Sequence, residues 1–379
     1  MAREYKIINA DGHTIEPPDM WQRHMPKKYQ DRIPRLVKDP KGGDAWEFEP
    51  GAPPMPIGLV TTPGKTYEQF HWYGSTYDAI NPGCFLGEDR LKEGDFDGVD
   101  AEVLYPSQRT MRYFMMNEDD GFHQAGLEAY NNWIFDEYCA ADHSRLIGLA
   151  QMANLGIEHS ISELRDAKKR GFKGVIISAW PSGGEKLCQD DEPFWAAAEE
   201  EQMPVHIHIG VQTASRKVAG SAKQTAISTG GLPGLATMGG GIAGISQTMA
   251  DLIFSEMFDR YPALKMVGVE VGAGWVPAFL EHMDDHYWRN RHWCNSQLQM
   301  LPSEYFHRNW HVTFIREPFA VANRHAIGVE NMMWSTDYPH HRCDWPYSRR
   351  IIDEMFFGVA ADERRAIVCE NALKLYKLG

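Results

Sequence analysis

Short apolar runs recur along the whole chain and alternate with segments of helical periodicity. The runs are rich in Val and Ile, and they cover residues 5–10, 101–106, 145–152, 172–178, 204–209, 264–270, 310–315 and 331–336. Runs this apolar are typical of strands that are buried on both faces, as in a parallel sheet covered by helices. The pattern therefore predicts eight buried strands.

The segments between these runs predict helices. The helical period is found at residues 121–141, 157–169, 192–202, 242–259, 275–289 and 317–325, with further helices after residue 346. Regular alternation of strand and helix indicates parallel pairing through right-handed crossovers. Eight such units close most economically into a (β/α)8 TIM barrel. We therefore expect an α/β protein with a single barrel domain over residues 1–379.

Two regions do not follow the repeat. Residues 22–95 lie between the first two strands and are rich in Pro, Gly, Trp and Tyr, which predicts an inserted cap after strand one. Residues 210–245 follow the fifth strand and include "STGGLPGLATMGGGIAG". A loop of this length is either a functional lid or a plain flexible connection, and length alone does not decide between them.

Composition and charge narrow the class of partner. The chain of 379 residues has 43% hydrophobic and 24% charged residues, with a formal net charge of −14. The negative charge argues against nucleic acid and against an anionic membrane surface. No apolar stretch reaches the length of about 18 residues that a membrane span needs, and the N-terminus lacks the apolar region of a signal peptide. We expect a cytoplasmic protein that acts on a small molecule.

The six cysteines form no recognisable framework. They lie far apart, with no CxxC pair, in a chain long enough to fold without cross-links. We expect reduced thiols at Cys84, Cys139, Cys188, Cys294, Cys343 and Cys369.

Metal-capable side chains fall near the ends of several predicted strands, where the active sites of such barrels lie. These residues are Asp11 and His13 at strand one, His206 and His208 in strand five, Glu270 at strand six, and Asp337 at strand eight with His340 and His341 close behind. Residues two apart in a strand point to the same side, so Asp11 and His13 form a chelating pair. The same rule places His206 and His208 on one face.

Each of these residues also has a structural interpretation. A lone strand histidine such as His206 is more often a hydrogen-bonded core residue than a ligand. Asp11 before Gly12 is compatible with an ordinary turn. Glu270 and Asp337 are harder to explain in this way, because a carboxylate that ends an apolar run is costly to bury unless it is paired or metal-bound.

Six segments along almost the whole chain resemble the amidohydrolase-related family, the branch of the amidohydrolase superfamily that includes aminocarboxymuconate-semialdehyde decarboxylase. The segments are "DGHTIEPPDMW" (11–21), "DFDGVDAEVLYPS" (95–107), "ELRDAKKRGFKGVII" (163–177), "PVHIHIG" (204–210), "RYPALKMVGVEVGAGWVPAFLEHMD" (260–284) and "STDYPHHRCDWP" (335–346). The resemblance implies a metal-dependent barrel enzyme.

The resemblance also implies a ligand set. His13 matches the second histidine of the family's opening His-x-His pair, and Asp11 stands where the first would be. His208 matches the ligand of strand five, and Asp337 matches the aspartate of strand eight. Glu270 occupies the place usually held by a histidine of strand six. Two imidazoles are thus replaced by carboxylates.

The carboxylate-rich ligand set changes the expected metal. Hard oxygen donors shift the preference toward manganese or iron over zinc. Carboxylates also bridge metal ions, so we expect one or two divalent ions. Candidates for a second metal, or for support of the first, are Glu16, His206 and His341.

The family's usual chemistry gives the first functional hypothesis. A small carboxylate-bearing substrate would be decarboxylated by a carbon–carbon lyase or cleaved by a hydrolase, and the sequence does not separate the two. Asp337 and His340 are the candidate catalytic residues for proton transfer. Arg316, directly after strand seven, is the first choice for the substrate carboxylate, ahead of Arg109, Arg112 and Arg342.

Two other hypotheses remain. The carboxylates suit a dinuclear iron or iron/manganese hydroxylase that activates oxygen on the same barrel. A non-catalytic partner subunit is the third reading, because fold alone does not guarantee activity. The aromatic segments "QFHWYG" (69–74) and "HYWRNRHWC" (286–294) suit a subunit interface as well as a substrate pocket. We expect a homodimer or a hetero-oligomer with a related barrel subunit.

Overall fold

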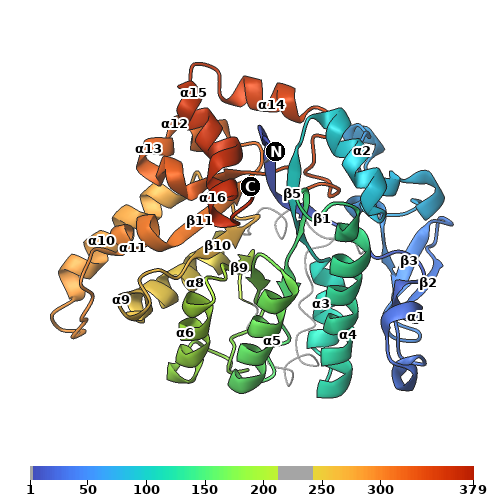
Figure 1. The fold of residues 1–379 in the computed structure, drawn as a ribbon, viewed down its shortest axis with the longest axis horizontal. Coiled ribbons are helices and arrows are strands. Elements are labelled where there is room, and N and C mark those ends of the chain that lie inside the picture. The colour runs from blue at the N-terminus through green and yellow to red at the C-terminus, as the bar shows by residue number, and fades with distance from the viewer. Residues whose placement is uncertain (1–2, 212–241) are drawn as a thin grey trace. The chain divides into compact units, whose positions relative to one another are not determined.

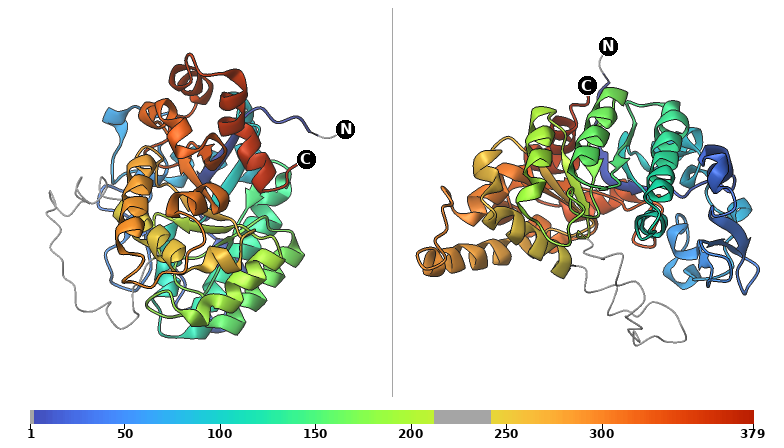
Figure 2. Two further views of the ribbon diagram at one scale, coloured as in Figure 1. Left: turned by 90° about the vertical axis from the view of Figure 1, so that its left-hand side faces the viewer. Right: turned by 90° about the horizontal axis from the view of Figure 1, so that it is seen from below.

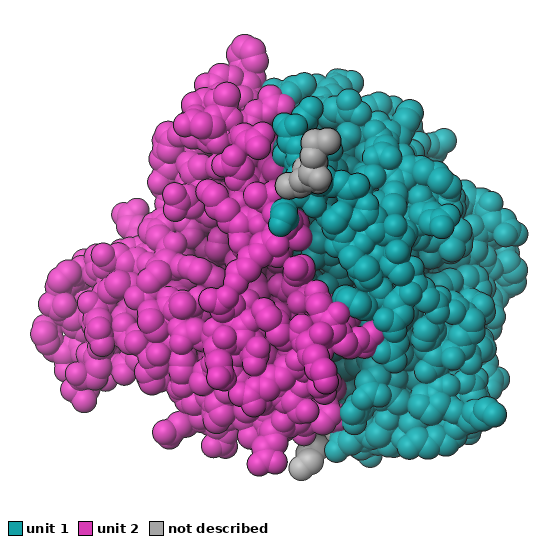
Figure 3. All heavy atoms as spheres, in the orientation of Figure 1, with its two compact units in different colours: residues 1–151, 335–354, 379 teal, residues 152–334, 355–378 magenta. Residues whose placement is uncertain are grey.

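The computed structural model describes residues 3–211 and 242–379, without the side chains of 108, 109, 242 and 243. The chain divides into two compact units, which are coloured separately in Figure 3. Unit 1 comprises residues 1–151, 335–354 and 379, and unit 2 comprises residues 152–334 and 355–378. Each unit contains parallel strands followed by helices.

The centre of unit 1 is a buried parallel sheet of order β1-β5-β6 (Figure 1). Its strands are β1 (Ile8–His13), β5 (Ala101–Tyr105) and β6 (Leu146–Gly148), followed by the short β7 (Ala150–Gln151). All residues of β1 and β5 are buried, as the apolar runs predicted. The register of β1 against β5 shifts between Asn9 and Gly12. This irregularity falls just where β1 delivers Asp11 and His13.

The insertion after β1 folds as a small antiparallel sheet with short helical turns. The sheet has the order β2-β3-β4, with β2 (Arg35–Lys38), β3 (Asp44–Glu47) and β4 (Met55–Pro56), preceded by α1 (Met20–His24). Trp46 donates a hydrogen bond to the Tyr77 hydroxyl, which in turn donates to the Glu16 carbonyl at 2.7 Å. The aromatic residues of the insertion thus anchor it to the chain that leaves β1.

Helices of unit 1 begin and end at recognisable residues. They are α2 (Gly87–Asp97), α3 (Gln108–Met115), α4 (Asp120–Trp133) and α14 (Ser348–Met355), whose last residue belongs to unit 2. Gly98 ends α2 with a left-handed φ of 84°, a conformation in which glycine carries no Cβ penalty. The Asp119 side chain caps α4 by accepting from the Phe122 amide. Phe114 of α3 packs against Phe122 of α4 at a ring distance of 5.2 Å.

Unit 2 contains a second buried parallel sheet, in which neighbouring strands are consecutive in the chain. Its strands are β8 (Val175–Ile176), β9 (Val205–His208), β10 (Met266–Val269), β11 (Trp310–Phe314) and β12 (Met332–Trp334), in the order β12-β11-β10-β9-β8. Val269 lies opposite His208 in the register of β10 and β9. The residues that follow these two positions therefore leave the sheet at the same end.

The helices of unit 2 connect these strands. They are α5 (Ile157–Arg170), α6 (Glu192–Glu200), α8 (Ile242–Phe254), α9 (Met257–Arg260), α10 (Val276–Asn290), α11 (Pro302–Asn309), α12 (Pro318–Ala322), α13 (Arg324–Ile327), α15 (Ala361–Arg365) and α16 (Asn371–Leu375). Helices α5 and α6 lie side by side (Figures 1 and 2). The Asn371 side chain donates to the carbonyls of Val329 and Met332, which fixes α16 against β12.

All eight predicted strands are confirmed, although two are shorter or broken. The run at 172–178 contributes only Val175–Ile176, and the run at 145–152 is split into β6 and β7. The sequence did not predict α3 or α11, because each is a short polar helix whose amphipathic period spans barely two turns. Helix α2 begins inside the predicted insertion, ends two residues beyond it and completes the crossover to β5.

The structure tests the remaining predictions from the sequence only in part. The division into one barrel domain with a cap and a lid stays a prediction, and residues 212–241 of the expected lid lie outside the described residues. The six cysteines are all free thiols. In the described ranges, every helix is too short or too polar to cross a membrane.

Candidate metal centre

Strand β1 brings Asp11 and His13 to the same place with both side chains fully buried. His13 Nε2 lies 3.4 Å from Asp11 Oδ1. The other ring nitrogen, Nδ1, lies 3.3 Å from the Pro106 carbonyl oxygen. A proton on Nδ1 donates to this carbonyl and leaves the Nε2 lone pair for a metal ion. The chain thus holds His13 in the orientation and tautomer that a ligand requires.

Gly12, between these two residues, is required by close packing. A Cβ atom at this position would lie 2.9 Å from side-chain atoms of Arg90, Asn9 and Glu102. These three side chains form a buried group behind β1. Any larger residue at position 12 would displace it.

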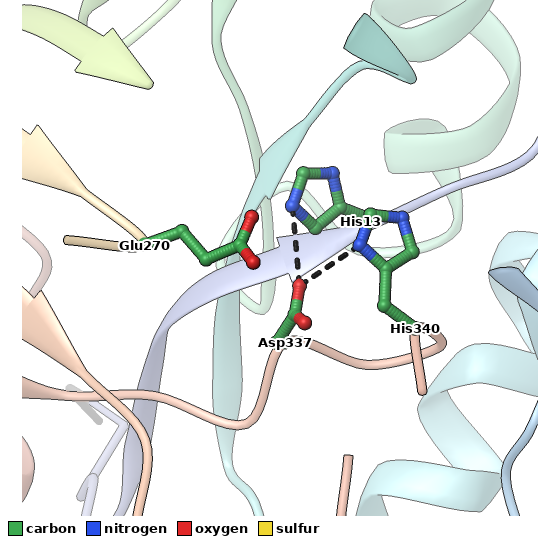
Figure 4. A group of neighbouring side chains, drawn as sticks. All are labelled: His13, Glu270, Asp337 and His340. Atoms are coloured by element: carbon green, nitrogen blue, oxygen red, sulfur yellow. Dashed lines mark ion pairs between the residues drawn. The ribbon is translucent and has the colours of Figure 1, made fainter. Parts of the chain in front are cut away.

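The loop after β12 supplies Asp337 and His340 beside His13. Asp337 Oδ1 lies 3.4 Å from His13 Nε2 and 3.0 Å from His340 Nδ1 (Figure 4). The His340 ring stacks on the His13 ring at 4.0 Å with an interplanar angle of 20°. The Asp337 amide donates to the Asp11 carbonyl at 2.9 Å, and its φ of 57° turns the chain at this point. Four predicted residues therefore meet within unit 1.

The electrostatics of this group favour a bound cation. Burial raises the pKa of Asp337 well above its ordinary value, while His13 lowers it and Asp11 raises it. Two fully buried carboxylates at close range are unstable together unless they are protonated or share a positive charge. Nitrogen and carboxylate oxygen donors in this number suit a divalent ion, so the residues present fit a metal site.

A buried ion pair behind β1 holds the group in place, and sequence reasoning missed it. Arg90 of α2 forms two hydrogen bonds to the Glu102 carboxylate, each at 2.7 Å, and donates to the His13 carbonyl at 3.0 Å. Asn9 donates to Glu102, and its side-chain oxygen accepts from the amides of Asp11 and Thr336. The network joins β1, β5, α2 and the loop after β12. The sequence signal was limited to Glu102, a carboxylate within the apolar run of β5, because Arg90 lies among many other charged residues of α2.

Unit 2 holds a second pair of the predicted ligands. His208 at the end of β9 and Glu270 directly after β10 leave neighbouring parallel strands, and His208 Nε2 lies 3.5 Å from Glu270 Oε2. Glu270 adopts a left-handed φ of 56°, and its amide donates to Thr313 Oγ1 at 2.9 Å. A strained conformation that hydrogen bonds hold in place is common at functional sites.

Two candidates for a second metal or a supporting role lie apart from these groups of donors. His206 stacks on Tyr376 at a ring distance of 5.7 Å, and burial lowers its pKa to about 3, with a smaller effect from His311. Glu16 is fully buried, and burial raises its pKa to about 7. Neither residue, nor His341, belongs to a group of three or more close donor atoms in the part of the chain that the structure describes.

Three of the four predicted arginines lie at the surface. Arg316, Arg112 and Arg342 are exposed, and the side chain of Arg109 lies outside the described residues. The charge of Arg342 lowers the pKa of Asp337, as a smaller effect than burial, His13 and Asp11.

A wide cavity of about 1320 Å³ also lies in unit 2. It is lined by the loop around Cys188, by Trp180 and Trp195, and by residues of α8 such as Thr248 and Phe254. Neither His208 nor Glu270 is among its described lining residues. The cavity therefore does not by itself mark the metal centre.

Comparison with known proteins identifies the class. The pattern of the amidohydrolase family matches residues 81–378, so the chain belongs to the amidohydrolase family. It is a metal-dependent enzyme of that family. The match covers the ends of β9, β10 and β12, although β1 with Asp11 and His13 precedes it.

Solved structures show the fold. An amidohydrolase from Mycobacterium avium subsp. paratuberculosis K-10 is similar with a TM-score of 0.76 and 19% identity, over 99% of this chain and 98% of that one. The 5-carboxyvanillate decarboxylase of Sphingomonas paucimobilis has a TM-score of 0.64 and 17% identity, over 99% and 100%. A dihydroxybenzoic acid decarboxylase from Polaromonas sp. JS666, solved with bound manganese, has a TM-score of 0.62 and 15% identity, over 99% and 98%. The expected (β/α)8 fold class is confirmed.

Proposed function

We propose that this enzyme removes the carboxyl group of a small aromatic carboxylate in a reaction that depends on a divalent metal ion. The proposed ligands are Asp11, His13 and Asp337 of unit 1 and His208 and Glu270 of unit 2. The proposal is supported by the buried donors of each unit, by membership of the amidohydrolase family, and by the decarboxylases of similar fold. Hydrolysis of a small carboxylate-bearing substrate is the related alternative within the same class.

The metal ion, with manganese or iron favoured over zinc, would supply a Lewis acid that orients the substrate oxygens and stabilises negative charge in the transition state. The ligands from this chain would be two imidazoles and three carboxylates. Such an oxygen-rich set is what manganese and iron prefer. Two ions are compatible with the number of carboxylates.

Proton transfer falls to Asp337 and His340. Decarboxylation breaks a carbon–carbon bond, releases carbon dioxide and requires one proton on the ring carbon that loses the carboxyl group. His340 Nδ1 faces Asp337 at 3.0 Å, and its partly exposed ring lets it exchange protons with solvent. A histidine that a carboxylate orients in this way can hold a proton and deliver it. In hydrolysis the same pair would accept a proton from the attacking water.

The substrate carboxylate requires a cation besides the metal. Arg316 lies two residues after the end of β11 and is exposed. An arginine binds a carboxylate through two parallel hydrogen bonds. Arg342 is the alternative from unit 1. Replacing each by Lys, and comparing the KM values for the two variants, would identify the anchor.

The observation that carries the proposal is the buried group of Asp337, His13 and His340. We expect Asp337→Asn to lose most of its metal and to lower the rate of carbon dioxide release about 10²- to 10⁴-fold. The substrates to test are hydroxybenzoates and carboxyvanillates, with the metal measured by mass spectrometry. Asp285→Asn, on the exposed face of α10, is the matched control and should keep both metal and activity. Full activity in Asp337→Asn would exclude the proposed site.

The donor set also supports a second candidate, oxygen activation by a dinuclear iron or iron/manganese centre. Asp11 and Glu270 stand where the family usually has histidines, and carboxylates bridge such ions readily. Protein purified without chelators would then contain two iron or manganese ions per chain and would consume oxygen with its substrate. One metal ion per chain, and turnover that continues without oxygen, would favour decarboxylation.

Assembly is also part of the proposal, as a homodimer or as a hetero-oligomer with a related barrel subunit. Trp288 and Trp293, near the end of α10 in unit 2, are exposed by 52% and 75%. Tryptophan is enriched in interface cores, so these side chains suit burial against a second copy. Light scattering of the wild type and of Trp293→Ser would show whether an oligomer forms and depends on this segment.

A further inference from the structure

Unit 2 contains a compact cavity of about 390 Å³ at the end of its sheet opposite to His208 and Glu270. Pro204 and Lys265 of its lining directly precede β9 and β10, and His311 is the second residue of β11. Pro204 is four strand residues before His208, a distance of roughly 13 Å along the strand. The cavity is therefore separate from the proposed ligands of unit 2.

Charged side chains of both signs line this cavity, with a small excess of lysines. Three lysines line it, Lys265, Lys374 and Lys377, against two glutamates, Glu199 and Glu330. This excess of positive charge contrasts with the net charge of −14 for the whole chain. The contrast favours an anionic ligand at this place.

Lys265 and His311 form the inner part of the cavity. Lys265 is half-buried, with one hydrogen bond from Nζ to the Arg308 carbonyl, so two of its N–H groups remain available. The Nδ1 atom of His311 is buried and has no hydrogen-bond partner among the described residues. Both side chains line the same cavity. Burial lowers the pKa of His311 to about 4, with a smaller effect from the charge of Lys265. A carboxylate between them would accept from both.

Apolar side chains form another part of the lining. Met203, Pro204 and Leu264 are buried, and Leu375 of α16 also lines the cavity, beside the polar Gln202 and Asn371. The cavity volume lies within the range of small-molecule sites, which combine such apolar walls with a few placed polar groups. With only one more lysine than glutamate, the site favours a single negative charge over a phosphate dianion.

We propose that this cavity binds a small organic monocarboxylate with a compact apolar body. The carboxylate would accept hydrogen bonds from Lys265 and His311, while the apolar body packs against Met203, Leu264 and Leu375. The site lies outside the proposed metal ligands, so the proposal stands independently of the reaction that the enzyme catalyses. The monocarboxylate bound in this cavity would be a separate ligand and not the substrate that the enzyme converts.

Binding of 4-fluorobenzoate to the full-length metal-loaded enzyme, followed by fluorine NMR, tests the proposal. We expect Lys265→Met to reduce the number of bound ligands by one or to weaken that site at least tenfold. Ala263→Trp, which fills the cavity from its exposed rim, should do the same if Lys265→Met folds poorly. Lys168→Met, on the exposed surface of α5, is the control and should bind as the wild type does.

Two further measurements distinguish binding in this cavity from binding at the metal centre and from binding of any small anion. Asp337→Asn should retain this site, and inorganic phosphate at equal concentration should not displace the ligand. Unchanged binding in both Lys265→Met and Ala263→Trp would overturn the proposal. Loss of all binding in Asp337→Asn would assign the ligand to the metal centre instead, and stronger displacement by phosphate would overturn the monocarboxylate.

Discussion

Individual residues at the candidate metal centre are fixed by the groups that surround them. His13 contacts the Pro106 carbonyl through one ring nitrogen and faces the two aspartates with the other. Gly12 leaves the room that Arg90, Asn9 and Glu102 occupy. The chemistry of His13 therefore depends on neighbours that are distant in sequence but fixed in space.

Glu16 gives a prediction at this scale. Its pKa is raised from 4.5 to about 7 by burial, so the folded state binds a proton more strongly than the unfolded state does. The stabilising effect of the protonated form is present below pH 4.5 and is lost as the pH rises through 7. We expect Glu16→Gln to raise the free energy of unfolding at pH 8 by up to roughly 3 kcal/mol, as measured by urea denaturation.

The same variant separates a structural role from a metal ligand. A structural Glu16 predicts unchanged metal content and a smaller decline of stability between pH 5 and pH 8. If Glu16 binds a second metal ion, Glu16→Gln should instead lose metal and have a lower free energy of unfolding than the wild type. Wild-type protein measured at each pH is the reference.

At the scale of elements, the Arg90–Glu102 pair joins a helix to two strands and to the loop that carries Asp337. Arg90 is fully buried, and its guanidinium lies 3.8 Å from the centroid of the Tyr338 ring. Neighbouring segments along the chain are positioned by their own turns and caps, but β1 and the loop after β12 are more than 300 residues apart. Backbone hydrogen bonds, such as that from the Asp337 amide to the Asp11 carbonyl, and side-chain hydrogen bonds of this kind together fix them in place.

Arg90→Met therefore has a large predicted effect. Removing one partner of a buried pair leaves the Glu102 carboxylate without compensation, which typically costs about 3–5 kcal/mol. We expect this loss in urea denaturation, together with lower metal affinity, because the His13 carbonyl also loses its donor. Arg289→Met, which breaks an exposed pair within α10, should leave the unfolding transition unchanged. Equal behaviour of the two variants would contradict the positioning role.

For the whole molecule, the proposed ligand set draws on both compact units. A ligand that binds only the folded state stabilises it in proportion to the logarithm of its concentration over Kd, by about 2.7 kcal/mol at a hundredfold excess. Metal binding should therefore raise the thermal stability of the chain as a whole.

Metal removal tests this expectation. We expect a chelator to lower Tm by several degrees in calorimetry, and added manganese to restore it. Asp337→Asn should show a small response to either treatment. A wild-type Tm that is insensitive to both would argue against a metal held by these ligands.

The sequence by itself determined the eight strands, their alternation with helices and the residues at the strand ends. It could do so because a strand covered on both faces must be apolar throughout, and a carboxylate that ends such a run must be compensated. The family resemblance added the proposed ligand set, including the two carboxylates at positions 11 and 270. These are local properties of short segments, which a single sequence displays directly.

Tertiary structure alone decided which of these residues meet. It stacked His340 on His13, placed His206 against Tyr376, buried Glu16, and set Arg90 and Glu102 behind β1. The contacts of His13 with His340, of His206 with Tyr376 and of Arg90 with the loop after β12 join residues that are distant in the chain. The sequence pattern of one segment does not specify which distant segment packs against it. The positions of the supporting residues therefore follow from long-range packing, not from local periodicity.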